Sequence, residues 1–473
     1  MTASESSGPL PWQRSLLVGV IAMVVGLGVG LVVSASPLMI AVGIVVFGLG
    51  LSLVTRFEYT VLALFILRSG MDLFSGYQLP VAFALGIDGL AIGYVVTLLM
   101  ARRRVHLDGF WVFFALWTGL QGVWVVLMAL GATGMDSALL SVSLREWIRL
   151  FSWVLGYLLI LQFKDRLPPE RVMGLLFLAL VIPLFTAFLQ LLLPPHLLPS
   201  VLVFDGGGAF EANSRISGSL GHSNTFGVYV LFFLGLTYWK ALYATRRIGW
   251  LMLLGLLAFF LVSTKALGAM AMFGTFILLV TIPRLTFSRL VGSGILATVI
   301  VALFVSTEFG RRRLASLYDT PLLNPNINWS RSVLLSWYDG NSFNWRIAQW
   351  TFLLDAWQDA PLLGHGLNSS SYLTVLENYA HNEYVRSLAE GGIIGFGLFL
   401  MFFGVQAIWL GRVAICTPPN HPRRALAQIM LAFLGALMVG MGTENIWTHT
   451  TLFYYWWTLF AILSWDWLDS KTT

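Results

Sequence analysis

Long apolar runs that recur along the whole chain constrain its fold more than any other feature. A helix that spans a membrane needs about 20 mostly apolar residues, and about 14 candidate runs of this kind are present. Hydrophobic residues make up 58% of the 473 and charged residues only 11%, whereas soluble domains carry roughly 25% charged residues. We therefore predict an all-α, polytopic integral membrane protein with about 12–14 transmembrane helices. The candidate runs are 16–33, 38–54, 58–74, 80–100, 109–130, 146–163, 172–193, 223–243, 248–263, 266–283, 290–306, 386–410, 426–443 and 450–465.

Composition and motif content exclude several other classes of protein. The single cysteine, Cys416, rules out a disulfide framework and a cysteine-based metal site. The net charge of +6 comes from basic residues scattered among short loops, which does not indicate nucleic-acid binding. No HExxH or Cys/His spacing points to a metal, and no Walker-type loop or GxGxxG motif points to a nucleotide. We therefore expect no metal and no cofactor.

Lysine and arginine residues in the connecting loops predict which side of the membrane each loop occupies. If every span is counted, the basic clusters fall on alternate connections and so on one side, the cytoplasm, with both termini. The first apolar run is expected to be a retained span, because no cleavage site of small residues follows a short apolar core. The clusters are Arg14, Arg56, Arg102–Arg104, Lys164/Arg166/Arg171, Arg246–Arg247, Arg284/Arg289 and Arg412/Arg423/Arg424.

The domain organisation follows from the two long polar loops on the other side. We predict transmembrane helices at 1–306 with an outer loop at 194–222, a large extracytoplasmic loop at 307–385, and C-terminal transmembrane helices at 386–473. A structureless connection as long as the large loop would be unusual, so one or two helices should lie in it on the outer leaflet. One would end at Asp359–Pro361 and the Gly364–Gly366 turn. Its aromatic face would comprise Trp345, Ile347, Trp350, Phe352, Leu353, Leu354 and Trp357, with Trp329, Trp337 and Trp357 near headgroup depth.

Ionisable residues within spans are costly, by about 2.5–3.5 kcal/mol each on insertion scales. Most of them lie toward the outer ends of their spans, where cations from the outer loops join them. Several cations on one face indicate a shared anionic partner, mutual pairing, or both. Arg68–Asp72 and Glu146–Arg149 also have the spacing of pairs within one helix. The set in or near spans is Arg68, Asp72, Asp88, Arg145, Glu146, Arg149, Lys265, Arg386, Glu390 and Glu444; Arg215, Arg346 and His381 come from outer loops.

Arg215 and Lys265 have no acidic neighbour at helical spacing. Arg215 lies in a glycine- and serine-rich segment that leads into a new helix; a helix start favours an anion, and arginine binds phosphate with two parallel hydrogen bonds. The alternative is a simple turn in which Asn224 caps the helix. Lys265 interrupts an apolar stretch, 248–283, that is too long for one span and fits a hairpin of two. Its ammonium is available to a phosphate, or it merely extends to the membrane interface.

His381 is the candidate for proton chemistry, because histidine titrates near neutral pH. A lone histidine in a loop is usually only solvated, but His381 opens an apolar helix whose following turns supply Arg386 and Glu390. The Gly391–Gly392 pair would allow close helix packing just below. His365, flanked by glycines, is the competing histidine, whereas His222 is interpreted as a polar loop residue.

In these motifs the chain resembles the O-antigen ligase and polymerase family, membrane glycosyltransferases that use polyprenyl-pyrophosphate-linked glycans. The resemblance begins at Arg215 and runs through the C-terminal part; the N-terminal spans match only in general character. Lys265 departs from the family, which usually has arginine there, so the charge is kept and the bidentate fork is lost. The matching residues are Arg215-Ile216-Ser217-Gly218 with Gly221 and Asn224; Ser263-Thr264-Lys265; and Arg346, Pro361–Gly366, His381-Asn382 through Leu388, Glu390, Gly391 and Gly395.

The resemblance implies a fold like that of the GT-C glycosyltransferases and an inverting, metal-independent transfer on the outer face. Arg215 and Lys265, with Arg149 or Arg68 as further candidates, would bind the pyrophosphate and stabilise the charge that develops as it leaves. His381 would deprotonate, or at least orient, the acceptor hydroxyl. Supporting or substrate-binding roles would fall to Asn382, Arg346, Arg386, Glu390 and Asn224.

The expected partners are an undecaprenyl- or other polyprenyl-pyrophosphate-linked glycan donor, a glycan or lipid A core acceptor, and membrane lipids. The expected location is the bacterial inner membrane, with the active site facing the periplasm or the cell exterior. Ligases and polymerases need the same pyrophosphate site, so the motifs do not separate them. A secondary transporter of a small anion or a polysaccharide-related solute is the alternative of another class, and a non-catalytic membrane scaffold is a third.

Overall fold

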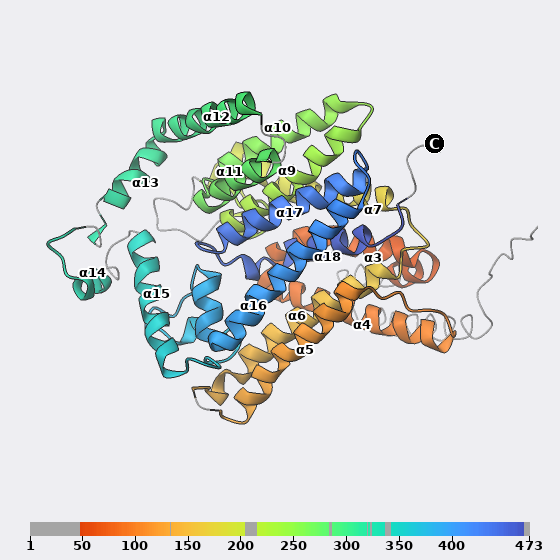
Figure 1. Cartoon of the computed structure of the whole chain (residues 1–473), viewed down its shortest axis with the longest axis horizontal. Helices are drawn as coiled ribbons and strands as arrows, with labels where there is room; N and C mark the ends of the chain where they lie inside the picture. Colours follow the sequence, from red (N-terminus) through yellow and green to blue (C-terminus); the bar gives the residue numbers. More distant parts are fainter. Residues whose placement is uncertain are drawn as a thin grey trace, which may run out of the picture.

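The computed structural model describes residues 48–132, 134–203, 215–282, 286–318, 320–321, 324–335 and 342–467. Within these ranges every regular element is a helix, which confirms the all-α prediction (Figure 1). The predicted span at 16–33 and the first part of that at 38–54 lie outside the described residues, as do Trp337 and Arg14.

The helices follow one another along the chain with short connections. They are α3 (Phe57–Met71), η1 (Asp72–Tyr77), α4 (Leu79–Met100), α5 (Gly109–Ala129), η2 (Ser137–Leu139), α6 (Leu140–Leu161), α7 (Pro169–Leu176), η3 (Phe177–Leu180), α8 (Val181–Leu192), η4 (Pro195–Leu197), η5 (Ser200–Leu202), α9 (Ser223–Tyr243), α10 (Arg247–Ser263), α11 (Leu267–Thr281), α12 (Phe287–Ser306), α13 (Glu308–Tyr318), α14 (Trp329–Leu335), α15 (Ser342–Asp359), η8 (Ser370–Tyr372), α16 (Glu383–Cys416), α17 (Pro422–Gly440), η9 (Ile446–Thr448) and α18 (Thr450–Leu463).

Among the described residues, 6 helices are long and apolar enough to cross a membrane, and three shorter apolar helices accompany them. The prediction of a polytopic membrane protein is therefore confirmed, and each span predicted from residue 58 onward has a helix at its position. The long helices are α4, α5, the combined α7–α8 segment Pro169–Leu192, α9, α16 and α17; the shorter ones are α10, α11 and α18.

The run 172–193 was predicted as one span, and the segment found there, Pro169–Leu192, is divided by the short 3-10 helix η3. Pro183 explains the division, because proline lacks the N–H that would bond the carbonyl of Ala179, four residues earlier. The Tyr229 hydroxyl of α9 donates to that carbonyl instead, at 2.7 Å. The irregular turn therefore keeps its buried carbonyl paired and ties α9 to α7–α8.

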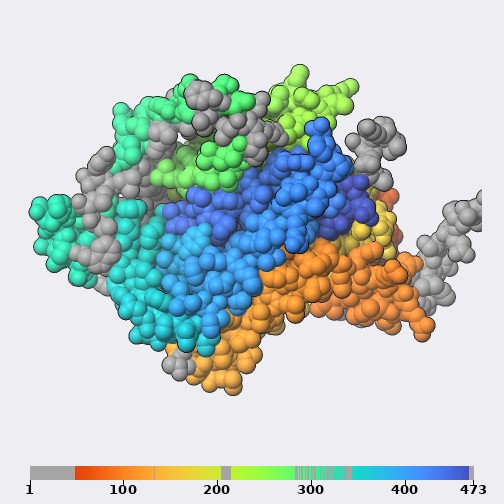
Figure 2. All heavy atoms as spheres, in the orientation of Figure 1, coloured from red at the N-terminus to blue at the C-terminus, as the bar shows by residue number. Residues whose placement is uncertain are grey.

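Aromatic side chains fill the centre of the bundle around α18. Tyr455, Trp456 and Trp457 are each at most 1% exposed. Trp457 lies 4.5 Å from the ring of Phe114 in α5, measured between ring centroids. Lipid tails are as apolar as these side chains, so close packing rather than escape from water holds such helices together. Figure 2 shows the C-terminal helices, in blue, lying across the middle of the face, between the green α10–α12 and the orange α4–α5.

Helix α16 is broken inside its length at Gly392, whose φ of 61° and ψ of −166° are not helical. The loop that follows α15 pairs with the broken turn through four backbone hydrogen bonds. His365 N and Gly366 N donate to the carbonyls of Ala389 and Glu390, and Ile393 N and Ile394 N donate to those of Pro361 and Leu362. A Cβ atom on Gly392 would lie 2.3 Å from the backbone of Leu362. The prediction that Gly391–Gly392 allows helix packing was therefore wrong: Gly392 admits a crossing loop.

The predicted large loop, 307–385, contains the helices α13, α14 and α15, whereas one or two had been expected. Helix α15 covers the predicted aromatic segment and ends at Asp359, as predicted. In Figure 1 these three helices lie at the left end of the molecule, away from the C-terminus on the right. The start of α16 lies beside α15 at the same end, so the site residues of both elements meet there.

Candidate active site

A chain of polar contacts joins four segments that lie far apart in the sequence. Before α9, Arg215 Nη2 donates to Asn224 Oδ1 at 2.7 Å, and Arg215 Nε donates to the Thr264 carbonyl at 3.1 Å. Asn224 Nδ2 donates to Glu444 Oε2 at 2.7 Å. The other carboxylate oxygen, Oε1, lies 3.6 Å from Arg346 Nη2 of α15. Two cations predicted from the outer loops thus meet around one buried carboxylate.

His381 lies next to this chain of contacts, just before α16. Its backbone N–H donates to Asn445 Oδ1 at 2.7 Å, and its ring Nδ1 lies 3.1 Å from Asn445 Nδ2. The ring also meets Trp345 of α15 edge to face, with centroids 5.7 Å apart. Asn382 caps α16, since its side-chain oxygen accepts from two backbone N–H groups of the first turn. Its observed role is therefore supporting.

The histidines near Arg346 are held in the neutral state. Burial above all, then the charges of Arg346 and His222, lowers the pKa of His381 to about 3. Burial, then the charges of Arg215 and Arg346, likewise lowers the pKa of His222 to about 4. At neutral pH the site therefore combines two charged guanidiniums and two neutral imidazoles with the carboxyl group of Glu444.

Lys265 occupies the tight turn between α10 and α11, so the predicted hairpin of two helices is confirmed. Its backbone has a φ of 52°, the left-handed region that residues with a side chain seldom adopt. The preceding residue, Thr264, supplies the carbonyl that Arg215 Nε contacts. The turn therefore brings Lys265 beside the Arg215 end of the site.

Arg386 and Glu390 form a second polar cluster in the first turns of α16, which follow His381 in the chain. Arg386 makes ion pairs with Glu383 and, at 2.7 Å, with Glu390 Oε2. Ser370 Oγ donates to Glu390 Oε1 at 2.7 Å, and the Trp447 backbone N–H donates to Glu383 Oε1 at 2.7 Å. These side chains are satisfied by one another, and removing one partner would leave a buried charge unpaired.

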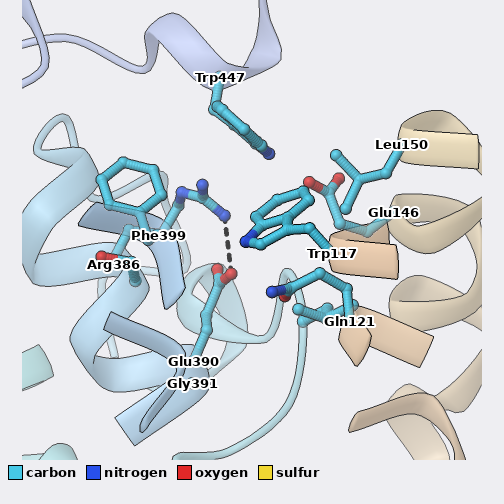
Figure 3. Close-up of a pocket in the computed structure, with 12 residues that line it drawn as sticks. Trp117, Gln121, Glu146, Leu150, Arg386, Glu390, Gly391, Phe399 and Trp447 are labelled. Carbon is cyan, nitrogen blue, oxygen red and sulfur yellow. Dashed lines mark hydrogen bonds and ion pairs between the residues drawn. The ribbon is translucent and has the colours of Figure 1, made fainter. Parts of the chain in front are cut away.

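A small cavity of about 40 Å³ lies against this second cluster, large enough for a few water molecules. Figure 3 shows Arg386 and Glu390 facing Glu146 across it, between the rings of Trp117 and Trp447. The cavity is lined by residues of α5, α6 and α16 and does not include His381 or Arg215. It is too small for a sugar, so it is not the place where a glycan would bind.

The remaining candidates for pyrophosphate binding, Arg149 and Arg68, have local partners. Arg149 pairs with Glu146 in α6, and Arg68 Nη1 pairs with Asp72 Oδ1 at 2.7 Å. The interpretation of both as pairs within one helix is confirmed. Arg68 Nη2 also donates to Thr450 Oγ1 at 2.7 Å, which places α3 against the start of α18.

The competing histidine, His365, is held by backbone carbonyls. One ring nitrogen contacts the Gly134 carbonyl, and the other lies 2.7 Å from the Ala356 carbonyl. With both ring nitrogens engaged, His365 fixes the loop after α15. Of these two candidate histidines, His381 is the one that lies near a cation of the site, Arg346.

Sequence reasoning missed three members of the site. Glu444 was noted only as a stranded charge, His222 was interpreted as a polar loop residue, and Asn445 was not considered. The available signal was the pair Glu444-Asn445 between two apolar runs, which places polar residues at a helix end on the predicted outer side.

No group of three or more His, Cys, Asp or Glu side chains in the described part of the chain could hold a metal ion. The carboxyl oxygens of Glu444 already face Asn224 and Arg346. The donor groups present fit an anion better than a divalent cation, which prefers several carboxylate oxygens.

Fold and site together define a polytopic, all-α membrane protein with a cation-rich site at one end of its helical bundle. Residues 250–400 match the family described as O-antigen ligase, so the chain contains an O-antigen ligase domain and the resemblance is confirmed. The matched range includes Lys265, Arg346, His381 and Glu390. The match supports membrane glycan transfer of the O-antigen ligase or polymerase type, from a lipid-linked glycan to a glycan acceptor. No curated protein matches the chain.

The neutral histidines predict acid sensitivity. The folded-state pKa values of His381 and His222, about 3 and 4, lie below the 6.5 of an unperturbed histidine, so the unfolded chain takes up protons first as the pH falls. Their contribution to stability is present above pH 6.5 and is lost toward pH 4 and 3; at pH 5 each costs at most about 2 kcal/mol. Burial raises the pKa of Glu444, which acts in the opposite sense.

We expect the unfolding temperature in detergent to fall between pH 7.5 and pH 5. His222→Gln, which retains a polar side chain without a basic nitrogen, should show a smaller fall than the wild type. An equal fall in both proteins would contradict the assignment for His222.

Proposed function

We propose that the protein transfers a glycan from a polyprenyl-diphosphate carrier to a hydroxyl of an acceptor, on the extracytoplasmic face of the bacterial inner membrane. The transfer would invert the anomeric centre and need no metal. The observation that carries the proposal is the meeting of Arg215 and Arg346, from distant segments, around Glu444 and beside His381.

The charge and geometry of this site suit a diphosphate. The site holds two guanidiniums and one carboxyl group, because Arg346 lies 3.6 Å from Glu444 and Arg215 reaches Glu444 through Asn224. This balance of charge attracts an anion, and arginine matches phosphate oxygens with two parallel hydrogen bonds. The 21-residue helix α9 begins at Ser223, and its positive end lies at the same place. These groups would hold the diphosphate and stabilise the negative charge that develops on it as the glycosidic bond breaks.

The positions of the candidates divide their proposed roles. Arg215, Arg346 and Lys265 would bind the diphosphate, with Asn224 and Glu444 orienting the two guanidiniums. His381 would contact the reacting groups, and Asn382 would fix the start of α16. Arg386 and Glu390 would support α16 from below, whereas Arg68 and Arg149 would reach a phosphate only after leaving their carboxylate partners.

Incubation of the purified protein with a defined polyprenyl-diphosphate-linked oligosaccharide tests the proposal. Capture of the glycan by a lipid A core acceptor would identify a ligase, and chain extension without that acceptor would identify a polymerase. Neither product, from protein that is folded and membrane-inserted, would overturn the proposed function.

Removal of divalent metals should leave the reaction unchanged, since guanidiniums and helix ends would supply the positive charge. The measurement is the initial rate with and without excess EDTA, using protein already dialysed against the chelator. A rate that collapses in EDTA and returns with added magnesium would contradict the metal-independent mechanism.

One observation favours a transporter as the second candidate. Transporters often bind substrate at discontinuous helices, and α16 is broken at Gly392. In this chain, however, the backbone groups beside the break pair with the loop after α15. Substrate-dependent uptake into proteoliposomes, without any glycan product, would favour the transporter.

A further inference from the structure

The hydrogen bonds of His381 determine which of its ring nitrogens carries the proton. Asn445 contacts His381 twice, through its two side-chain atoms. The backbone N–H of His381 can only donate, so the Asn445 atom that faces it must be the carbonyl oxygen, Oδ1. The other atom, Nδ2, is then an amide nitrogen that can only donate, and it lies 3.1 Å from Nδ1 of the ring.

Nδ1 of His381 must therefore accept a hydrogen bond, and an accepting ring nitrogen carries no proton. In the neutral imidazole the proton then lies on Nε2. If the Asn445 amide were rotated by 180°, its NH₂ group would face the backbone N–H of His381, and neither group can accept a hydrogen bond. The positions of the amide oxygen and nitrogen are therefore fixed by the backbone N–H. Asn445 is thus a positioning residue that selects the tautomer.

His222 shows the same arrangement with a different donor. Its Nδ1 lies 3.1 Å from the backbone N–H of Asn224, which can only donate. Nδ1 of His222 is therefore also unprotonated, and its proton also lies on Nε2. Two half-buried histidines near Arg346 thus both present an N–H group at Nε2, because the groups that face their Nδ1 atoms can only donate.

We propose that His381 acts as a neutral hydrogen-bond donor through Nε2–H to the diphosphate of the donor lipid, and not as the base that deprotonates the acceptor. This inference rests on the proposed function and assigns a role within it. A base needs a lone pair on the nitrogen that meets the substrate, and Asn445 leaves a proton there instead. A neutral imidazole is an effective donor to developing negative charge when its environment prevents it from becoming charged.

The proposed step balances without a protein base. The acceptor hydroxyl oxygen forms the new bond to the anomeric carbon, and the bond from that carbon to the diphosphate oxygen breaks. The electron pair of the broken bond passes to the departing diphosphate, where Nε2–H of His381 and the guanidiniums meet the new charge. The hydroxyl proton passes to the departing diphosphate, whose new terminal oxygen has a pKa of about 6, and is released from there to water.

The tautomer can be measured without reference to activity. Protein labelled with ¹⁵N only in its 7 histidines, compared with a His381→Gln sample, assigns the two ring nitrogens of His381 by ¹⁵N NMR. We expect the proton on Nε2 in the protein without substrate. A proton on Nδ1 would overturn the inference whatever the enzyme proves to transfer.

Three substitutions of His381 separate a donor from a base. Glutamine places an amide N–H near the position of Nε2 and has no basic group, glutamate supplies a base and no donor, and alanine supplies neither. We expect His381→Gln to retain activity within roughly tenfold of the wild type, and the other two to lose roughly 10²–10³-fold. Glutamate more active than glutamine would overturn the donor role.

His421 provides the matched control. It has the same hydrogen-bond arrangement, with Nδ1 accepting from the Arg423 backbone N–H at 3.1 Å, but it precedes α17 at the end opposite Glu444. His421→Gln and His421→Ala should have equal activity. If wild-type protein makes no product at all, the proposed function fails; if it makes product and glutamine at 381 is no better than alanine, only the donor role fails.

Asn445→Asp gives the sharpest readout, because the two roles predict opposite pH dependences. The carboxylate would accept from Nδ1–H, so His381 becomes an imidazolium at low pH and, at high pH, a neutral ring with a lone pair on Nε2. The groups around it, Arg346 from α15, His222 before α9 and Glu444 in the loop after α17, are unchanged. If His381 acts as a hydrogen-bond donor, the Asn445→Asp variant should lose activity as the pH rises through the new pKa of His381. If His381 acts as a base, the variant should gain activity over the same range, and that result would overturn the proposal.

Discussion

Replacing Arg215 with alanine is expected to lower the rate of glycan transfer by roughly 10²–10³-fold, the usual cost of losing one group that stabilises developing charge. The Arg215 guanidinium joins the turn between α10 and α11 to the start of α9, through the Thr264 carbonyl and Asn224. The loss should appear mainly in the rate at saturating donor, because a departing diphosphate carries more charge than a bound one. Transfer from a defined lipid-linked glycan is the measurement.

Two comparisons separate charge from geometry at Arg215. Arg215→Lys keeps the charge and loses the second parallel hydrogen bond, so its activity should lie between those of wild type and alanine. Arg312→Ala is the control for the loss of one arginine, because Arg312 pairs with Glu308 on the exposed surface of α13. Arg215→Ala with wild-type activity would remove this residue from the site.

Replacing Gly392 with alanine is expected to destabilise the fold by about 4 kcal/mol or more, because two costs combine. The φ of 61° with ψ of −166° is a backbone conformation that only glycine adopts readily. The new methyl group would also lie 2.3 Å from the Leu362 backbone, which cannot move without breaking its own hydrogen bonds. Thermal unfolding of purified protein and the yield of monodisperse protein are the measurements.

Gly397→Ala is the matched control in the same helix. Gly397 has a helical backbone, and a Cβ atom there meets nothing within 4 Å. Alanine favours the helix over glycine by about 1 kcal/mol, so this variant should be no less stable than the wild type. Equal stability of both alanine variants would show that the loop after α15 does not cross α16 as described.

The helices of the bundle could be predicted from the sequence because a membrane span depends on local composition. A run of apolar residues is sufficient to place α9 or α17 within a few residues. The break in α16 could not be predicted in this way, because the Gly391–Gly392 pair has the same composition whether it packs against a helix or admits a loop. The choice depends on Pro361–Gly366, about 30 residues away in sequence, which bonds to the broken turn.

The site was predictable where a residue is unusual in its own segment. Arg215 and Lys265 stood out as cations with no acidic neighbour at helical spacing, and His381 as a histidine that opens an apolar helix. In the structure Arg215 contacts the residue before Lys265, and Arg346 lies near His381. Arg386 and Glu390 stood out equally, yet they pair in a separate cluster. Asn445 could not be recognised, because its importance lies in facing the His381 backbone and ring at the same time, which only the tertiary structure reveals.

The four backbone bonds between the loop Pro361–Gly366 and the broken turn of α16 also determine which changes in length the chain tolerates. An inserted residue between Pro361 and Gly366 would shift donors past their acceptors and detach α15, which carries Arg346. Among the described residues between α13 and α14, the backbone hydrogen bonds are local ones, from Asn324 N to the Pro321 carbonyl and from Ile327 N to the Asn324 carbonyl. A change of length there would leave the pairing between this loop and α16 intact, and with it the anchor of the helix that carries Arg346.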